Sequence, residues 1–285
     1  MAKERLTITL EKSLLDEIDT TIDGINVRNR SHAIERLIEI ALSQNAPRKA
    51  IILAGGEPVK FNGKYLPKPM ISIGGKPIME YTIKMLIRNG VNDLTILAGE
   101  KGDEIISYFG DGSRFGVKIT YLIEEKRRGT EGALLLAKGL VGSEPFFVIN
   151  GDNLYDFSIA EMYKQHISTK ALVTIALTTA EKTRGYGVIR LEGSKILDFV
   201  EKPANEKSKL ISTGFYLFSW GALDFIKQSN EPIMLEKSLF PMLASMGKLY
   251  GYVVAGNWVA LSSDNIEESI ENMEKVIKAS GKSDK

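Results

Sequence analysis

The feature that most constrains this chain is an alternation, from residue 49 onward, of short apolar runs and amphipathic segments. Residues 50–54 are apolar throughout and end in a Gly-Gly pair, which is typical of a strand buried on both faces. Residues 78–88 have the apolar spacing of a helix, and residues 94–98 form a second apolar run. This order predicts an α/β domain with a mainly parallel, doubly wound (Rossmann-like) sheet covered by helices on both faces.

The same patterns predict the other elements of a domain over residues 49–285. We expect further strands at 117–123 and 145–150, with helices at 102–109 and 131–140. The second half is richer in strands, which we expect at 171–178, 186–191, 195–201, 213–219 and 248–254. A helix over 264–279 closes the domain, and its apolar stripe (Ile266, Ile270, Met273 and Ile277) is interpreted as core packing.

Residues 1–45 follow a different pattern. Residues 5–10 alternate polar and apolar side chains, as in a strand, and Ser13 and Ser31 are placed to cap two amphipathic helices. A linker at residues 43–47 separates this module from the larger domain. One strand and two helices cannot bury a sufficient core, and a lone strand leaves an open edge. We therefore expect a homodimer through residues 1–45.

Composition excludes several classes of protein. The chain has no cysteine, so disulfides, thiolate zinc sites and cysteine nucleophiles are absent. It has no apolar run of about 18 residues, so no membrane contact is expected and the cytoplasm is the expected location. The two histidines, His32 and His166, are interpreted as structural. The net charge is +1, so any contact with DNA must come from a local surface.

The first module resembles the ribbon-helix-helix repressors over its full length, and this resemblance implies binding to a double-stranded DNA operator. In this family two chains pair their N-terminal strands into a two-stranded ribbon. The resemblance implies that three side chains of this ribbon contact base edges and that three residues at the start of the second helix contact phosphates. The first set is Arg5, Thr7 and Thr9, and the second is Asn29, Arg30 and Ser31. Over residues 1–49, however, eight Lys and Arg balance eight Asp and Glu. A dimerisation arm with a solvated outer face therefore stays open as an alternative.

Five motifs follow one another in the larger domain. They are Leu53-Ala54-Gly55-Gly56, Pro67-Lys68-Pro69-Met70, Gly74-Gly75-Lys76-Pro77-Ile78-Met79-Glu80, Asn150-Gly151-Asp152 and Glu201-Lys202-Pro203. In this order and spacing the set resembles the sugar-1-phosphate nucleotidyltransferases, over about residues 49–265. In that family a sugar phosphate attacks the α-phosphate of a nucleoside triphosphate and expels pyrophosphate. The resemblance therefore implies that the partners are a nucleoside triphosphate, a sugar phosphate and a nucleotide sugar.

The resemblance also implies roles for individual residues. Nucleotide binding falls to Leu53, Gly55, Gly56, Glu124, Gly129 and Thr130, and sugar-phosphate binding to Asn150, Glu201 and Lys202. Lys60 and Lys68 are the candidate catalytic residues, and Asp152 is the candidate ligand of Mg²⁺. A carboxylate at Glu124 could accept from guanine N1–H and N2–H, which favours guanine over uracil. The alternatives are a turn aspartate at 152, a solvated charge pair at 201–202 and a surface charge at 124.

The sequence departs from the family at two places. Pro58 stands where the family has a phosphate-binding glycine, and Lys60 stands where it has an arginine. Ala260 stands where the family has a second metal-binding aspartate, and Asp264 follows four residues later. These departures favour weak or lost catalysis and leave enzymatic activity uncertain. The main interpretation is therefore a DNA-binding transcription regulator whose larger domain binds a nucleotide sugar, nucleoside triphosphate or sugar phosphate as effector. The alternative is an active nucleotidyltransferase that is dimerised or DNA-tethered through its N-terminus.

Overall fold

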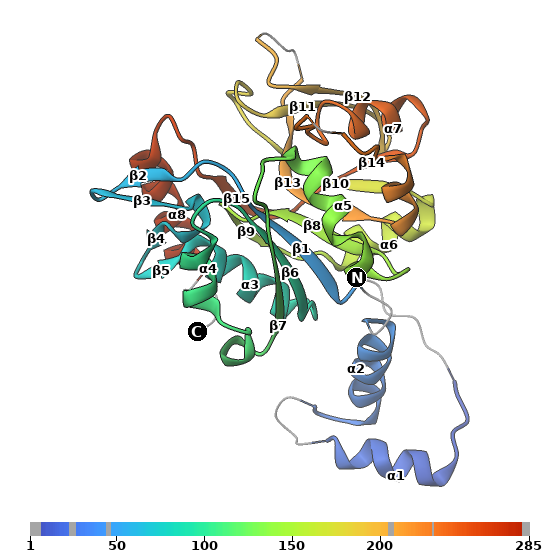
Figure 1. Ribbon diagram of the computed structural model, residues 1–285. Coiled ribbons are helices and arrows are strands. Elements are labelled where there is room, and N and C mark those ends of the chain that lie inside the picture. Colours follow the sequence, from blue (N-terminus) through green and yellow to red (C-terminus); the bar gives the residue numbers. More distant parts are fainter. Residues whose placement is uncertain (1–6, 23–26, 44–46, 205–207, 230, 281–285) are drawn as a thin grey trace. The chain divides into compact units, whose positions relative to one another are not determined.

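The computed structural model describes residues 7–22, 27–43, 47–204, 208–229 and 231–280 (Figure 1). The chain divides into two compact units, Met1–Ala46 and Pro47–Lys285. Within the described residues, every helix is too short or too polar to span a bilayer.

The first unit contains two helices, α1 (Lys12–Thr20) and α2 (Arg30–Ser43). Ile18, Val27 and Ala33 form its small buried core. Both predicted caps were wrong by two residues. In the first helix the N-cap is Glu11, and Ser13 lies inside the first turn. The side chain of Asn29 accepts the His32 backbone N–H at 3.0 Å, and Ser31 lies inside the first turn. Asparagine is as good an N-cap as serine. Because the second helix begins at Arg30, Asn29 occupies the N-cap position.

The predicted strand at residues 5–10 is not formed in the part that is described. Residues 7–10 have no strand partner, and Thr7 and Thr9 are exposed. A strand of this length needs a second strand to satisfy its backbone groups, and the described part of the chain offers none. Arg5 lies outside the described residues.

The second unit is built on a nine-stranded sheet in the order β10-β14-β12-β11-β13-β8-β1-β6-β7 (Figure 1). Its strands are β1 (Lys49–Ala54), β6 (Asp93–Ala98), β7 (Lys118–Ile123), β8 (Phe146–Asn150), β10 (Val173–Thr179), β11 (Gly187–Glu192), β12 (Lys195–Glu201), β13 (Leu210–Phe218) and β14 (Leu249–Val253). Strands β8, β1, β6 and β7 pair in parallel. The α/β class is confirmed, but the sheet is mixed rather than mainly parallel. Strand β13 runs antiparallel to β8, β10 and β11, and β12 forms a hairpin with β11. Tight turns can join such strands without a crossover helix.

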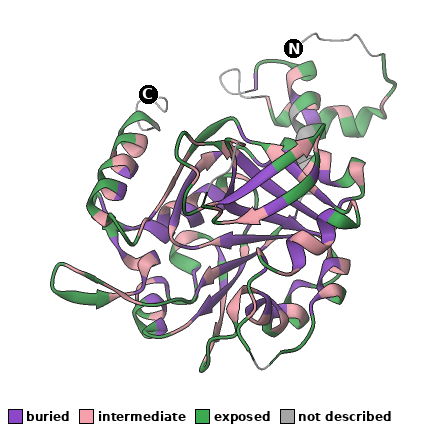
Figure 2. Ribbon diagram, turned by 90° about the horizontal axis from the view of Figure 1, so that it is seen from above, coloured by how far each residue is buried: buried purple, intermediate pink, exposed green. Residues whose placement is uncertain are grey.

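Helices cover both faces of this sheet, as predicted. The covering helices are α3 (Ile78–Arg88), α4 (Gly102–Phe109), α5 (Gly129–Val141), α6 (Ala160–Thr169), α7 (Leu239–Ser245) and the 3₁₀ segments Ser113–Phe115 and Trp220–Phe225. Alternate residues of β1 face opposite sides of the sheet and contribute to two separate hydrophobic cores. Ile52 packs into the cluster with α3, α4 and α6, whereas Ile51 packs into the cluster with α5 and α7. The central strands are accordingly buried along their length (Figure 2).

Smaller elements complete the unit around the strand ends. They are the hairpin β2 (Val59–Phe61) and β3 (Lys64–Leu66), the 3₁₀ turn Lys68–Met70, the pair β4 (Ser72–Ile73) and β5 (Lys76–Pro77), the pair β9 (Asn153–Phe157) and β15 (Gly256–Ala260), and α8 (Ile266–Ser280). The stripe of α8 packs as predicted, with Met273 fully buried beside Ile71 and Leu154. The structural interpretation of His166 is confirmed, because its ring nitrogens lie 2.8 Å from Thr174 Oγ1 and 2.9 Å from Ser219 Oγ.

Candidate functional site

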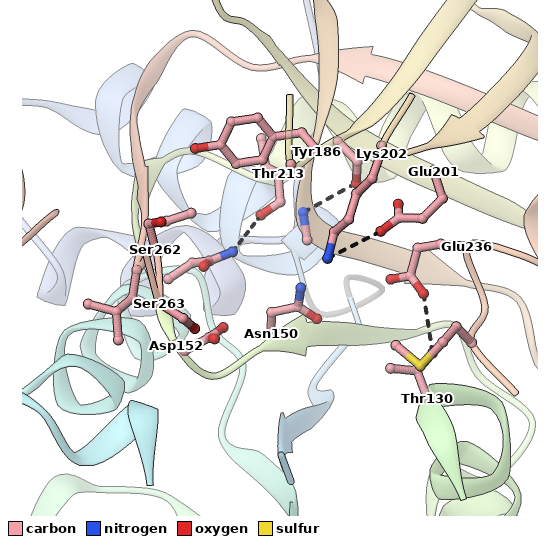
Figure 3. Close-up of a pocket in the computed structure, with 18 of the residues that line it drawn as sticks. Thr130, Asn150, Asp152, Tyr186, Glu201, Lys202, Thr213, Glu236, Ser262 and Ser263 are labelled. Atoms are coloured by element: carbon pink, nitrogen blue, oxygen red, sulfur yellow. Dashed lines mark hydrogen bonds and ion pairs between the residues drawn. The ribbon is translucent and has the colours of Figure 1, made fainter. Parts of the chain in front are cut away.

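A hollow of about 500 Å³ opens where β8 ends and where β12 and β13 pass alongside. Polar and charged side chains from at least four strands and their loops line it (Figure 3). Ligands of open α/β sheets bind at the carboxyl ends of the strands, and small-molecule sites have volumes of this order. The hollow is large enough for a sugar phosphate. The hollows are named after the ligands that the sequence resemblance implies, and this one is called the sugar chamber below.

A second hollow of about 210 Å³ adjoins the first, and it is named the nucleotide chamber below. Leu53, Gly55, Gly56 and Glu57 line it on the side of the loop after β1. The two chambers share a boundary made of five residues. These are Lys68, Thr130, Asn150, Asp152 and Met234. The arrangement can hold two molecules end to end, with a lysine and a carboxylate where they meet.

At this boundary the Lys68 Nζ lies 3.9 Å from an Asp152 carboxylate oxygen. Each side chain is 28% exposed. Burial raises the pKa of Asp152, and the positive charge of Lys68 partly opposes that rise. Backbone bonds fix the turn, because Gly151 donates to the Leu53 carbonyl at 2.9 Å. The boundary therefore presents opposite charges in fixed positions.

Ala260 lines the sugar chamber near Asp152. It pairs with Asn153 in the β9–β15 ladder, and the next backbone N–H, of Leu261, donates to the Asp152 carbonyl at 3.3 Å. Among the described residues no group of three His, Cys, Asp or Glu side chains is placed to hold a metal. Mg²⁺ needs only one or two protein carboxylates when phosphate oxygens and water complete its shell. The donor at Asp152 fits a magnesium ion that arrives with phosphates.

Glu201 is the last residue of β12, Lys202 follows it, and both line the sugar chamber. Lys202 has a φ of 48°, in the left-handed region, and its backbone N–H donates to the Tyr186 carbonyl at 3.1 Å. Its Nζ lies 3.7 Å from Glu201 Oε1. Burial raises the pKa of Glu201, the nearby negative charge of Glu236 adds to the rise, and Lys202 opposes it. The pair thus offers an acceptor and a cation to one ligand.

Asn150 is held against a glycine that no other residue could replace without movement. Gly214 has a φ of +74°, and a Cβ there would lie 2.4 Å from Asn150 Nδ2. The neighbouring amide of Asn153 donates to the Thr213 carbonyl at 3.0 Å. The amides of Asn150 and Asn153 therefore both line the sugar chamber, and Figure 3 shows the first of them, Asn150.

Glu124 follows β7 and lies against the loop after β1. A Cβ at Gly55 would lie 2.9 Å from Glu124 Oε2, so a side chain at this position would require the Glu124 carboxylate to shift. The Oε1 atom is buried and has no hydrogen-bond partner. Burial raises the pKa of Glu124, and a hydrogen bond from the Arg128 backbone partly opposes this. A buried carboxylate oxygen without a donor is costly, and a ligand N–H would satisfy it.

Five of the residues singled out from the sequence lie elsewhere or have another partner. Glu124, described above, lines neither chamber. Lys60 lines a separate hollow of about 380 Å³ beside Asp264 and Glu267, and borders neither chamber. Gly129 has a φ of +70° and packs on the backbone of Ile233. Arg30 donates from Nε to Asp19 at 2.7 Å, which holds it within the first unit. Asn29 caps α2 as described.

Sequence reasoning missed several residues of the sugar chamber. They are Asn153, Arg184, Tyr186, Thr213 and Glu236. Asn153 directly follows Asp152 and could have been suspected. Glu236 lies in an irregular segment before α7, where no periodicity or motif marks it. Only the packing of that segment against α5 brings it into the chamber.

Comparison with known proteins agrees with this geometry. A family model described as nucleotidyl transferase matches residues 49–261. The mannose-1-phosphate guanylyltransferase catalytic subunit beta of Danio rerio is 36% identical over 219 residues, which cover 74% of this chain and 60% of that protein. The mannose-1-phosphate guanylyltransferase of Mycobacterium tuberculosis is 30% identical over 214 residues, covering 73% and 59%. The chain thus spans about three fifths of the length of these relatives.

Solved structures show the same fold. A structure assigned to a glucose-1-phosphate thymidylyltransferase of Bacillus anthracis, in complex with sucrose, matches with a TM-score of 0.71 at 25% identity. The match covers 80% of this chain and 94% of that one. A UDP-glucose pyrophosphorylase complexed with UDP-glucose matches with a TM-score of 0.68 at 22% identity, covering 80% and 98%.

These findings correct the main interpretation of the sequence. A DNA-binding regulator with weak or lost catalysis was the wrong conclusion, because the relatives over the matched residues are sugar-phosphate guanylyltransferases. The physical error was to treat Pro58 and Ala260 as decisive. Lys68 and Asp152 still meet at the boundary of the two chambers, and one carboxylate suffices for a phosphate-borne Mg²⁺. The chain belongs to the nucleotidyl transferase family.

Proposed function

We propose that the unit Pro47–Lys285 transfers a guanylyl group from GTP to a hexose 1-phosphate, of which mannose 1-phosphate is the first candidate. The acceptor phosphate oxygen forms a bond to the α-phosphorus, the bond between the α-phosphorus and the bridging oxygen to the β-phosphate breaks, and pyrophosphate leaves. The observation that carries this proposal is the pair of adjoining chambers with Lys68, Asn150 and Asp152 in their common boundary.

The contents of the two chambers support this assignment of substrates. Glu201 and Lys202 offer a hydroxyl acceptor and a phosphate-binding cation in the sugar chamber. On the other side, Gly55 and Gly56 let the backbone approach a nucleotide without a side chain in the way. Glu124 lines neither chamber but lies against Gly55 of the nucleotide chamber, and its unpaired oxygen supports guanine, whose N1–H and N2–H groups are both donors.

The residues of the boundary perform positioning and charge neutralisation. Lys68 places positive charge beside the phosphates that meet there, and Asn150 offers amide donors to the phosphate or the sugar. Both groups are held before substrates bind, which favours in-line approach of the two phosphates. Asp152 would hold a Mg²⁺ ion, which, when bound, neutralises phosphate charge in the transition state.

A pyrophosphate-release assay tests the proposal. Purified full-length protein is supplied with Mg²⁺ and with each of the four ribonucleoside triphosphates in combination with mannose, glucose and galactose 1-phosphates. We expect the highest kcat/KM with GTP and mannose 1-phosphate. Absence of pyrophosphate release with every pair would overturn the proposal.

A specific observation also favours a role for the first unit, as a ribbon-helix-helix-like dimerisation module. Four large apolar side chains of this unit are 38–49% exposed, namely Ile8, Leu14, Leu37 and Ile38. About 45 residues bury too little surface to be stable alone. A second copy of the unit would cover these side chains and pair the segment at residues 5–10. Light scattering of the full chain and of a Leu14→Asp, Leu37→Asp double variant checks this. The expected result is a dimer that the double variant dissociates, and a monomeric wild-type chain would contradict it.

A further inference from the structure

Glu236 enters the sugar chamber from the segment between Trp220–Phe225 and α7 (Figure 3). Its two carboxylate oxygens each have a hydroxyl partner. Oε1 lies 3.1 Å from the Tyr216 hydroxyl, and Oε2 lies 3.3 Å from the Thr130 hydroxyl. Each oxygen has further acceptor capacity, because a carboxylate can accept about four hydrogen bonds in total. The side chain is therefore oriented without being saturated.

The segment that carries Glu236 is fixed to the start of α5. The Ile233 backbone N–H donates to the Arg128 carbonyl at 3.0 Å, and the Leu235 N–H donates to Thr130 Oγ1 at 2.8 Å. The contact has no spare room, since a Cβ at Gly129 would lie 2.2 Å from the Ile233 carbonyl oxygen. Glu236 is thus positioned by rigid elements before a ligand binds, as a recognition residue should be.

The other carboxylate, that of Glu201, lies beside Glu236 in the same chamber (Figure 3). The two are close enough for Glu236 to raise the pKa of Glu201, although burial is the larger cause. Lys202 lies near Glu201, whereas Glu236 is paired with hydroxyl groups alone among the interactions just described. Two carboxylates facing one cavity favour a ligand that brings hydrogen-bond donors and disfavour one that brings negative charge.

We propose that Glu236 is a sugar-specificity residue that, together with Glu201, accepts hydrogen bonds from hydroxyl groups of a neutral hexose 1-phosphate and excludes sugars that carry a carboxylate. The assignment rests on the proposed function of the two chambers, since it takes the larger one as the sugar site. Glu236 lines only that chamber, while its partner Thr130 also borders the nucleotide chamber. Its loss should therefore act on the sugar and spare the nucleotide.

The test compares Glu236→Gln and Glu236→Ala with the matched control Glu231→Gln, an exposed acid of the same segment outside the chamber. Losing a hydrogen bond to a charged group corresponds to about 10- to 100-fold in affinity. We expect Glu236→Ala to raise the KM for mannose 1-phosphate by about that factor. Glu236→Gln keeps one acceptor and should show about a tenfold effect. The KM for GTP, and all constants of Glu231→Gln, should stay within about threefold of wild type.

Deoxy analogues of mannose 1-phosphate identify the hydroxyl involved. One analogue should be a poor substrate of the wild type and lose nothing further in Glu236→Ala, as a double-mutant cycle requires for a direct contact. Mannuronic acid 1-phosphate should be rejected by the wild type and improved by Glu236→Gln. Equal losses across all deoxy analogues in the variant, or a raised KM for GTP alone, would overturn the proposal. Thermal unfolding of each variant shows whether it is folded, and the near-isosteric glutamine variant preserves the packing.

Failure of the proposed function is separable from failure of this inference. If the wild type releases no pyrophosphate with any substrate pair, the proposed reaction is wrong, and the role of Glu236 is then decided by calorimetric titration with GDP-mannose. A Kd raised at least about tenfold in Glu236→Ala, with no change in Glu231→Gln, supports the specificity residue. Equal affinities of wild type and Glu236→Ala, or no binding of GDP-mannose to the wild type, overturn it.

Discussion

Replacing Glu124 by glutamine should change which base the protein selects. The carboxylate lies against Gly55 with one buried oxygen that has no partner. Guanine would bring two N–H donors to the carboxylate. A good bidentate contact of this kind discriminates between bases by about 1–3 kcal/mol. The glutamine keeps one acceptor but turns an amide donor toward the second N–H of guanine. One hydrogen bond is therefore lost and a donor–donor repulsion is gained, and both changes weaken GTP binding.

The expected result is a loss of about 10- to 100-fold in kcat/KM for GTP. The kcat/KM for UTP should hold or rise, because the new amide can donate to a uracil carbonyl. Initial rates of pyrophosphate release with mannose 1-phosphate and each triphosphate measure this ratio. Glu125→Gln, the exposed neighbour, is the matched control and should behave as wild type. An unchanged ratio of GTP to UTP in Glu124→Gln would refute the placement of guanine beside this carboxylate.

Three further predictions concern other parts of the molecule. Asp152→Asn should lower kcat by about 10²–10³-fold in the same assay, while the exposed Asp198→Asn should not; equal kcat values for wild type and Asp152→Asn would remove this carboxylate from the mechanism. Gly214→Ala should lower the melting temperature, since the left-handed φ costs about 1–2 kcal/mol for alanine. It should also raise the KM for the sugar phosphate, because the new Cβ displaces Asn150. An unchanged melting temperature and KM would contradict the close contact. Burial lowers the pKa of His166 to about 4, so the neutral ring contributes stability that is complete above pH 6.5 and is lost as the pH falls toward 4. About 2 kcal/mol should be lost by pH 5. Urea unfolding at pH 7 and pH 5 measures this loss, and a His166→Gln variant that shows the same pH dependence as wild type would contradict it.

Local periodicity predicted the elements of the parallel half well, because those strands are buried on both faces and their side chains leave little ambiguity. The predicted runs at 50–54 and 94–98 correspond to β1 and β6 almost residue for residue. The direction of pairing in the second half was not predictable in the same way. The sequence pattern of a strand such as 195–201 is the same whether its neighbour runs parallel or antiparallel. The turns that connect the strands decide the direction of pairing.

The site was predictable where a motif lies in a strand-end turn. Gly55, Gly56, Asn150 and Asp152 all line the nucleotide chamber. Glu236 was not predictable, because its place depends on backbone contacts between segments about 100 residues apart. The strand predicted at residues 5–10 marks another limit. Its pattern requires a partner strand, and the described part of the chain supplies none for residues 7–10.

The boundary that the two chambers share has a consequence for the rate of turnover. In the proposed reaction each substrate contacts one chamber, whereas the nucleotide-sugar product spans the common boundary and contacts both chambers at once. For this product to dissociate, its contacts with the sugar and with the base must break together. Pyrophosphate dissociates from the nucleotide chamber alone. Turnover should accordingly be limited by how quickly the larger product escapes, and adding that product should inhibit competitively against either substrate.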